Sequence, residues 1–350
     1  MKPRSSTNCS GRDLAHAALF GLAIGDALGM PTQMLSRERI RELYGPGGLT
    51  GFEPAPPGHP IADGMPAGSV TDDTEQAVLL GRMLVAERGT LDPRRFAEAL
   101  SDWEADMEAR GSLDLLGPST KRAVDAVRAG ADPERTGLAG DTNGAAMRIA
   151  PVGIATPLSN GLGYLANKVQ EASKVTHNTS IALAGAAAVA AAVSAGVGGE
   201  AETVADATEI GIEAARLAAK RGHWIAGADV AARIEWATGL VRGKPPEQAA
   251  DLIYTLVGTS LATQESVPAA FAVLAAVPDD PWQACLLAAS LGGDCDTIAA
   301  IAGAIAGACH GPDGFPPEAI ATVERDGEVG GAWLDLAGLA DALYDLRESG

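Results

Sequence analysis

An acidic helix start at residues 291–297 constrains this chain more than any other feature. The segment reads Leu-Gly-Gly-Asp-Cys-Asp-Thr and runs directly into an uncharged stretch, 298–308. Isoleucine and alanine recur there at helical spacing, and two glycines add a small face. A helix of this composition belongs inside a domain. Asp294 and Asp296 are therefore predicted to be buried, where unpaired carboxylates are costly.

A second segment repeats the pattern. Residues 69–75 read Ser-Val-Thr-Asp-Asp-Thr-Glu and also open a helix with apolar residues behind them. Either start alone is consistent with ordinary capping, because Asp is preferred at helix N-termini and complements the helix dipole. Two such starts favour a shared site: if they face each other, four carboxylates and two threonines share one pocket. These residues are Thr71, Asp72, Asp73, Asp294, Asp296 and Thr297.

Such a pocket is electrostatically unfavourable when empty. Two like charges about 4 Å apart repel by about 4 kcal/mol at an effective dielectric constant of about 20. Four carboxylates in one pocket therefore raise one another's pKa values or require a cation. The candidate ligands are hard oxygens, and no Cys or His nearby is arranged for zinc. The pocket suits Mg²⁺ or Mn²⁺, and two ions are expected.

The composition predicts an all-α fold with a core of small residues. Hydrophobic residues make up 47% of the 350-residue chain but aromatic residues only 4%, and alternating β-branched runs are scarce. No linker divides the sequence, so we expect a disordered lead-in over 1–10 and a single domain over 11–350. The region 312–349 has surface character, with a final helix expected over 332–347.

Charge and cysteine usage limit the partners and the compartment. The net charge of −19 argues against nucleic acid and against an anionic membrane surface as partners. The four cysteines show no paired spacing, and no secretory segment follows Met1, which favours a reduced, cytoplasmic protein. The uncharged run 181–197 consists mainly of Ala and Gly, so it predicts a buried helix rather than a membrane span. The oligomeric state is left open.

Other polar segments are weaker signals. The Gly- and Pro-rich stretch 45–69 is long enough to be a lid over the pocket, with His59 expected to be exposed. Asp26 lies on a helix face made bare by glycines, where a structural hydrogen-bonding role and a functional one are equally consistent. The turn 140–148 can present backbone N–H groups to a phosphate. His177 opens another helix and is consistent with a cap or with substrate contact.

Taken together, these segments resemble the ADP-ribosylglycohydrolase family (the dinitrogenase-reductase-activating glycohydrolase type). Matching segments occur in the family's order between about residues 14 and 310. They are Gly25-Asp26-Ala27-Leu28-Gly29, Thr71-Asp72-Asp73-Thr74, Asn143-Gly144-Ala145-Ala146-Met147-Arg148, Thr176-His177 and Gly292-Gly293-Asp294-Cys295-Asp296-Thr297. No single segment is decisive, but five in order are highly specific.

The resemblance implies a fold, a metal centre and a substrate class. The fold would be a compact, orthogonal multi-helix domain with a binuclear Mg²⁺ or Mn²⁺ centre. By motif match, the metal ligands would be Thr71, Asp72, Asp73, Asp294, Asp296 and Thr297. The side of the cleft that binds ADP-ribose would be formed by Asn143, Gly144, Ala145, Met147, Arg148 and His177.

One position departs from the family pattern. Many members carry a Glu shortly after the segment that corresponds to 25–29, where it contacts a metal ion or the bound water. Here Gln33 stands at or near that place and is assigned to substrate binding. An amide oxygen can ligate a cation but cannot take up a proton as a carboxylate does. The departure leaves the family's full mechanism open for this chain.

The function that we expect is metal-dependent hydrolysis of the glycosidic bond between ADP-ribose, or a related riboside, and an acceptor such as a modified protein side chain. Asp73 is the first candidate for the base that takes the water proton, with Asp72 and Asp294 as rivals. One alternative is a metal-dependent nucleosidase acting on a small free or phosphorylated nucleoside. Another is an inactive binding protein that retains the fold.

Overall fold

The computed structural model describes residues 9–112, 116–329 and 334–350, without the side chains of 326–329. Helices account for the regular structure of the described chain, which has isolated bridges but no extended strand. In chain order, the α-helices are α1 (Gly11–Gly29), α2 (Arg37–Tyr44), α3 (Asp72–Ala86), α4 (Pro93–Ala109), α5 (Pro118–Arg128), α6 (Gly144–Met147), α7 (Ala150–Ala155), α8 (Leu162–Ser173), α9 (Ser180–Gly198), α10 (Val204–Ala218), α11 (Val230–Val241), α12 (Pro246–Leu252), α13 (Thr263–Ala276), α14 (Pro281–Ala289), α15 (Cys295–His310), α16 (Pro317–Val329) and α17 (Leu336–Ser349). The all-α, single-domain prediction is confirmed.

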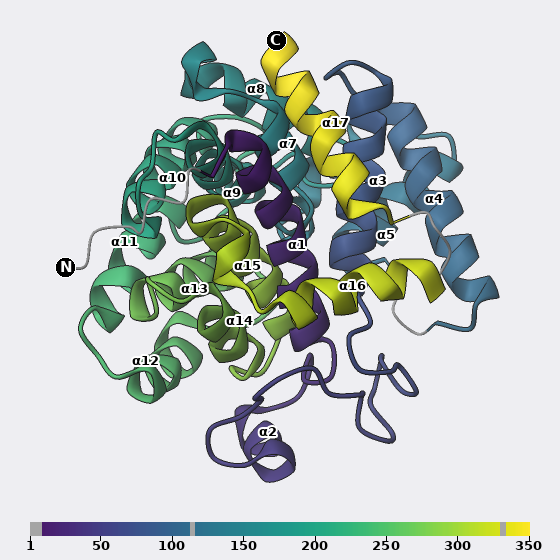
Figure 1. Cartoon of the computed structure of the whole chain (residues 1–350). Coiled ribbons are helices and arrows are strands. Elements are labelled where there is room, and N and C mark those ends of the chain that lie inside the picture. The colour runs from purple at the N-terminus through teal and green to yellow at the C-terminus, as the bar shows by residue number, and fades with distance from the viewer. Residues whose placement is uncertain (1–8, 113–115, 330–333) are drawn as a thin grey trace.

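Helices α1 and α15 form the centre of the domain (Figure 1). Their glycines let the two backbones touch: a Cβ atom on Gly25 would lie 2.1 Å from the Ala299 carbonyl oxygen, and one on Gly303 would lie 2.0 Å from that of Gly21. Such distances exclude any side chain. At the C-terminal end of α1, Gly29 meets the backbone of Asp296 in the same way. The glycine face of α1 therefore sets the position of the acidic start of α15.

Helix α9 is a core helix. It is long and apolar enough to cross a membrane by length and composition, but 94% of its apolar window is buried inside the protein. All its residues from Ser180 to Val197 are buried, and its neighbours include α7, α10 and α15. Small side chains allow these helices to approach closely on every side of α9. The structure agrees with the buried helix predicted from the Ala- and Gly-rich composition.

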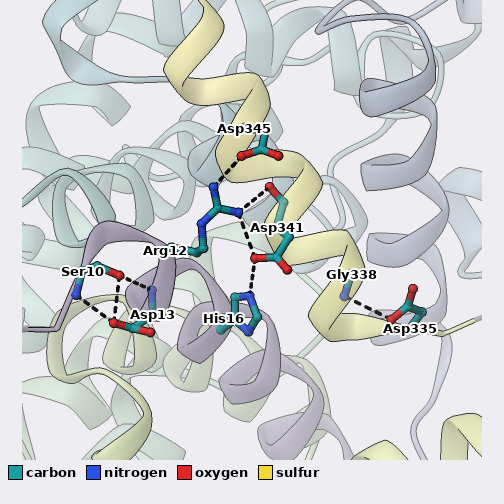
Figure 2. Close-up of polar contacts among 8 residues, drawn as sticks. All are labelled: Ser10, Arg12, Asp13, His16, Asp335, Gly338, Asp341 and Asp345. Carbon is teal, nitrogen blue, oxygen red and sulfur yellow. Dashed lines mark hydrogen bonds and ion pairs between the residues drawn. The ribbon is translucent and has the colours of Figure 1, made fainter.

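The C-terminal region contains more helix than the sequence predicted. Helix α16 occupies part of the region predicted to have surface character, where only a final helix was expected, and that final helix begins at Leu336. Helix α17 packs across α1, and ion pairs link the two helices at the surface (Figure 2). Arg12 lies 2.9 Å from Asp341 and 2.5 Å from Asp345, and His16 Nε2 lies 2.9 Å from Asp341. Most of the predicted lead-in, residues 1–8, lies outside the described residues.

The segment 45–69 has no helix or strand but is partly built into the fold. Ala55 and Ala62 pack with Met30 in a small second core. The prediction of an exposed His59 is wrong, since the residue is 3% exposed. Its Nε2 lies 2.9 Å from the Gln33 carbonyl oxygen, and its Nδ1 accepts from the Ala62 N–H at 2.9 Å. The segment is thus attached to the turn that follows α1.

Candidate active site

The two acidic helix starts lie side by side. The Thr297 hydroxyl, at the start of α15, donates a hydrogen bond of 3.2 Å to Asp73 Oδ2, at the start of α3, although 224 positions separate them in sequence. Asp73, Asp294, Asp296 and Thr297 are all buried. The facing arrangement that the repeated pattern predicted is therefore present.

Ordinary capping does not account for either start. Thr71 and Asp294 occupy the N-cap positions of α3 and α15, yet neither side chain accepts a capping hydrogen bond in the described structure. An N-cap Asp or Thr normally accepts from a backbone N–H two or three residues further on. The Asp294 carboxylate instead accepts from the side chains of Asn143 and Thr297, at the space between the helices.

Asp26 from α1 caps helix α3 instead. Its Oδ2 accepts from the backbone N–H groups of Thr71 at 2.9 Å and Thr74 at 3.1 Å, and from the Thr74 hydroxyl at 2.5 Å. Its Oδ1 accepts from the Thr71 hydroxyl at 2.7 Å. Asp26 is fully buried, and desolvation raises its pKa to about 6. These contacts establish a structural role for Asp26: it fixes the helix start that carries Asp72 and Asp73.

A glycine turn places the other acidic start. Gly292 and Gly293 have φ angles of 92° and 76°, in the left-handed region that favours glycine. A Cβ atom on Gly293 would also lie 2.3 Å from the Thr259 carbonyl oxygen. The Asp294 N–H donates to that same oxygen at 2.7 Å, and the Met34 N–H donates to the Gly293 carbonyl at 2.7 Å. The turn is thereby attached on both sides before α15 begins.

Asn143 links the turn before α6 to the acidic cluster. Its Nδ2 donates to Asp294 Oδ2 and, at 3.0 Å, to Ser266 Oγ. The Ser266 hydroxyl in turn donates to the Ala262 carbonyl at 3.2 Å, so it is available as an acceptor for Asn143. Because an Asp carboxylate only accepts, the amide orientation of Asn143 is determined. Ser266 was not predicted as a site residue, because nothing in its local sequence distinguishes it from an ordinary buried serine.

These groups surround a cavity of about 200 Å³. Both acidic starts, the Asn143 turn and the turn after α1 contribute to its walls. The predicted site residues that line it are Gln33, Asp72, Asp73, Asn143, Gly144, Met147, Asp294, Asp296 and Thr297. The lining residues that the sequence analysis did not assign to the site are Met34, Ile61, Gly117, Pro118, Thr120, Thr142 and Leu261. Thr142 lies in the polar turn 140–148, and the others lie in loops or helix ends without a recognisable pattern.

Burial and mutual repulsion raise the pKa values of the carboxylates. The pKa of Asp73 lies well above its ordinary value, first because of desolvation and then because of the charges of Asp296 and Asp72. Desolvation raises the pKa of Asp294 to about 6, against the opposing hydrogen bonds from Asn143 and Thr297. Asp73 Oδ1 is buried without a hydrogen-bond partner among the described residues. An orphaned carboxylate oxygen in such a cluster fits a cation.

The oxygen atoms that line the cavity are of the type that binds hard cations. Carboxylate and hydroxyl oxygens are what Mg²⁺ and Mn²⁺ prefer, and no described cysteine or histidine lines the cavity. In the described chain, no three His, Cys, Asp or Glu side chains converge as a ready-made metal cluster. The carboxylates are spread around the walls of one cavity, an arrangement that reduces the repulsion between their charges. The predicted ligand Thr71 faces Asp26 rather than the cavity.

Three predicted substrate-binding residues are not part of the described cavity lining: Ala145, Arg148 and His177. Arg148 is 1% exposed and donates to Gln76 Oε1 at 2.8 Å and to the Thr176 hydroxyl at 2.6 Å. Desolvation lowers its pKa to about 10. Both terminal nitrogens of the guanidinium are thus bound by protein partners, whereas its Nε is buried without a hydrogen-bond partner among the described residues. Its direct contact with substrate stays a prediction.

His177 contacts a residue of the cavity wall. Its Nε2 lies 2.9 Å from the Thr142 hydroxyl, which belongs to the cavity lining, and its Nδ1 lies 2.8 Å from the Thr176 hydroxyl. Full burial, followed by the charge of Arg148, lowers its pKa well below the ordinary value. A neutral imidazole between two hydroxyls orients them.

The fold and the cavity define the class of protein: an all-α enzyme with a carboxylate-rich site. The chain matches the family model for ADP-ribosylglycohydrolase over residues 8–350, and it belongs to that family. Members of the family are hydrolases that act on glycosidic bonds, and so is this protein. The predicted family membership is confirmed.

Several relatives match nearly the whole chain. An uncharacterized protein of Escherichia coli K12, YegU, is 34% identical over 95% of this chain and 96% of its own length. ADP-ribosylarginine hydrolase Tri1 of Pseudomonas putida is 29% identical, over 95% of this chain and 78% of its own. ADP-ribosyl-[dinitrogen reductase] glycohydrolase of Rhodospirillum rubrum is 28% identical over 89% and 90%. A solved ADP-ribosylglycohydrolase-related protein complex has a TM-score of 0.69 at 24% identity, covering 97% of this chain and 99% of its own, and supports the fold.

Proposed function

We propose that this protein is a metal-dependent hydrolase that cleaves the glycosidic bond between ADP-ribose and an acceptor such as a modified protein side chain. The observation that carries the proposal is the cavity between α3 and α15, where buried carboxylates face one another without capping their own helices. Family membership supplies the reaction class. Mg²⁺ or Mn²⁺, as two ions, would be held by Asp72, Asp73, Asp294, Asp296 and Thr297. Thr71, the sixth predicted ligand, faces Asp26 in this structure and is left out of the proposed set.

Bound metal would polarise a water molecule and grip ribose hydroxyls, which is the chemistry that such ions supply in hydrolases. The protein's own residues would then move the proton. Asp73 is the first candidate for the base, because its pKa lies well above the ordinary value and its Oδ1 is orphaned. Asp72 and Asp294 are its rivals. Near wild-type turnover in Asp73→Asn, with metal still bound, would remove Asp73 from this role.

The remaining cavity residues would bind and orient the riboside. Asn143 holds Asp294 through one amide hydrogen and Ser266 through the other, so the carboxylate is kept in one orientation. Thr142 and Gly144 line the cavity in front of His177. Such preorganisation lowers the cost of placing the reacting groups.

A thermal melt of chelator-treated protein, titrated with Mg²⁺ and Mn²⁺ with and without ADP-ribose, tests the proposal. A ligand at about 100 times its dissociation constant adds about 2.7 kcal/mol of stability. We expect metal to raise the melting temperature and ADP-ribose to raise it further. No response to either would leave only an inactive protein that retains the fold.

A metal-dependent nucleosidase is a second candidate. The observation that favours it is the size of the cavity: about 200 Å³ is below the volume of typical ligand pockets, about 300–1,000 Å³, and is better matched to one riboside than to a whole dinucleotide-sized ligand. A panel of ADP-ribosyl-arginine, ADP-ribosyl-serine and simple nucleosides separates the two. Turnover of nucleosides alone would favour the nucleosidase.

A further inference from the structure

Gln33 carries an orphaned group of the cavity that differs in kind from a carboxylate oxygen. It lines the same space as Asp73 and is only 4% exposed. Its side-chain Nε2 is buried and has no hydrogen-bond partner among the described residues. Buried polar groups in native proteins are nearly always paired, so each exception requires an explanation.

The backbone of Gln33 is held firmly. Its N–H donates to the Gly29 carbonyl at 2.9 Å, at the end of α1. Its carbonyl oxygen accepts from His59 Nε2 at 2.9 Å. His59 Nδ1 accepts from the Ala62 N–H, so Nδ1 carries no proton and Nε2 must be the donor. The orphaned amide is consequently presented by a turn fixed on both sides.

Gln33 Nε2 and Asp73 Oδ1 need different partners. Asp73 Oδ1 is an acceptor, and a cation or a proton satisfies it. Gln33 Nε2 is a donor without a free electron pair for a metal ion, so only an acceptor atom satisfies it. Because carboxylates line the cavity, its electrostatic potential favours the N–H end of the Gln33 amide over the oxygen end. The acceptor that pairs with this N–H group would be an uncharged oxygen atom of the substrate.

We propose that Gln33 is a specificity-determining residue, whose Nε2 donates a hydrogen bond to a ribose hydroxyl oxygen of the bound substrate. This inference rests on the proposed function, which places a riboside in the cavity. In the free protein the buried Nε2 donor has no acceptor among the described residues, and the bound substrate would supply one. Discrimination then follows, because a ligand without the oxygen leaves the donor unpaired.

The substitution Gln33→Met tests the inference, since Met has a similar volume and no donor. We expect the dissociation constant of ADP-ribose, measured by calorimetry with saturating Mg²⁺, to rise about tenfold. We expect the melting temperature of the chelator-treated protein to rise as well, because the unmatched donor is removed. A merely structural role for Gln33 predicts a lower melting temperature.

Gln170→Met is the matched control. Gln170 Nε2 donates to Asn178 Oδ1 at 3.2 Å, and the residue does not belong to the described cavity lining. This variant should bind ADP-ribose within about twofold of the wild type, and its melting temperature should not rise.

The outcomes separate the inference from the proposed function. If Gln33→Met binds ADP-ribose as the wild type does, or melts at a lower temperature, the inference is overturned while the proposed function stands. If the wild type binds adenosine but not ADP-ribose, the proposed function fails, and a tenfold loss of adenosine affinity in Gln33→Met still supports the inference. If the wild type binds neither ligand with Mg²⁺ present, both fail.

Discussion

Helices α1 and α3 begin with the same residue types but use them differently. At α1, Ser10 and Asp13 form a capping box: the Ser10 hydroxyl accepts from the Asp13 N–H, and the Asp13 carboxylate accepts from the Ser10 N–H at 2.9 Å (Figure 2). At α3, the N-cap Thr71 makes no such bond in the described structure, and Asp73 is buried with an orphaned oxygen. A helix start that satisfies itself at the surface is structural. One that is capped from another helix keeps its carboxylates available for chemistry.

The largest effect should come from removing two charges of the α15 start. Asp294→Asn with Asp296→Asn should abolish hydrolysis and the metal-dependent increase in melting temperature. In the wild type, metal at about 100 times its dissociation constant should add about 2.7 kcal/mol to the free energy of unfolding. The metal-free variant should be at least as stable as the wild type, because repulsion among the carboxylates is relieved. An unchanged response of the melting temperature to Mg²⁺ would refute the proposed cation site.

Asp26→Asn should break the cap that α1 provides to α3. In the wild type, donors of Thr71 and Thr74 bind the Asp26 carboxylate, and in the variant some of them face an amide NH₂ group instead. Buried donors left without an acceptor should cost about 3 kcal/mol of unfolding free energy in total. Ser10→Ala at the surface capping box should cost only about 1 kcal/mol. Urea denaturation of both variants measures the difference. Equal losses would mean that burial adds nothing to the α3 cap.

The acidic starts should give the metal-free protein an unusual pH dependence. The pKa values of Asp26 and Asp294 are raised to about 6, so the folded state binds more protons than the unfolded state between the ordinary value and about 6. That stabilising contribution is complete below the ordinary pKa and is lost as the pH rises through about 6. Chelator-treated wild type should therefore lose more stability between about pH 5 and about pH 7.5 than the Asp294→Asn, Asp296→Asn variant does.

Subtracting the two denaturation profiles isolates this effect. Two buried histidines, His59 and His177, have lowered pKa values and contribute the opposite slope, but they do so in both proteins. Parallel profiles for wild type and variant would show that the α15 carboxylates do not bind the additional protons.

The smallest effect is expected at the surface contact between α1 and α17. Arg12→Ala removes the pairs with Asp341 and Asp345, whose side chains are 48% and 68% exposed. Exposed ion pairs of this kind are screened by solvent and contribute little. The urea midpoint at about 0.15 M salt should change only slightly. A large loss would show that docking of α17 depends on this cluster rather than on its buried leucines.

Much of this architecture could be predicted from local sequence. The apolar runs behind 69–75 and 291–297 predict buried helices, and the glycines at positions 21, 25 and 29 predict the close face of α1. Helix α2, of eight residues, was not anticipated, because so short a segment carries little periodic signal. The periodic pattern of α16 was not recognised in the region predicted to have surface character. His59 was misjudged, because a Gly- and Pro-rich loop gives no sign of the contact that buries it.

The sequence by itself determined the types of chemical group: two helix starts, each with hydroxyls and paired acids, and a family-like order of motifs. Only the tertiary structure decided which of these groups share a space. In the folded protein, Arg148 and Thr71 bind protein groups rather than the cavity, and Asp26 caps another helix. Ser266 accepts a hydrogen bond from Asn143. The physical reason is that helix formation depends on neighbours three or four positions apart. A site depends on contacts such as that of Thr297 with Asp73, which only packing of α1 against α15 and α3 brings within reach.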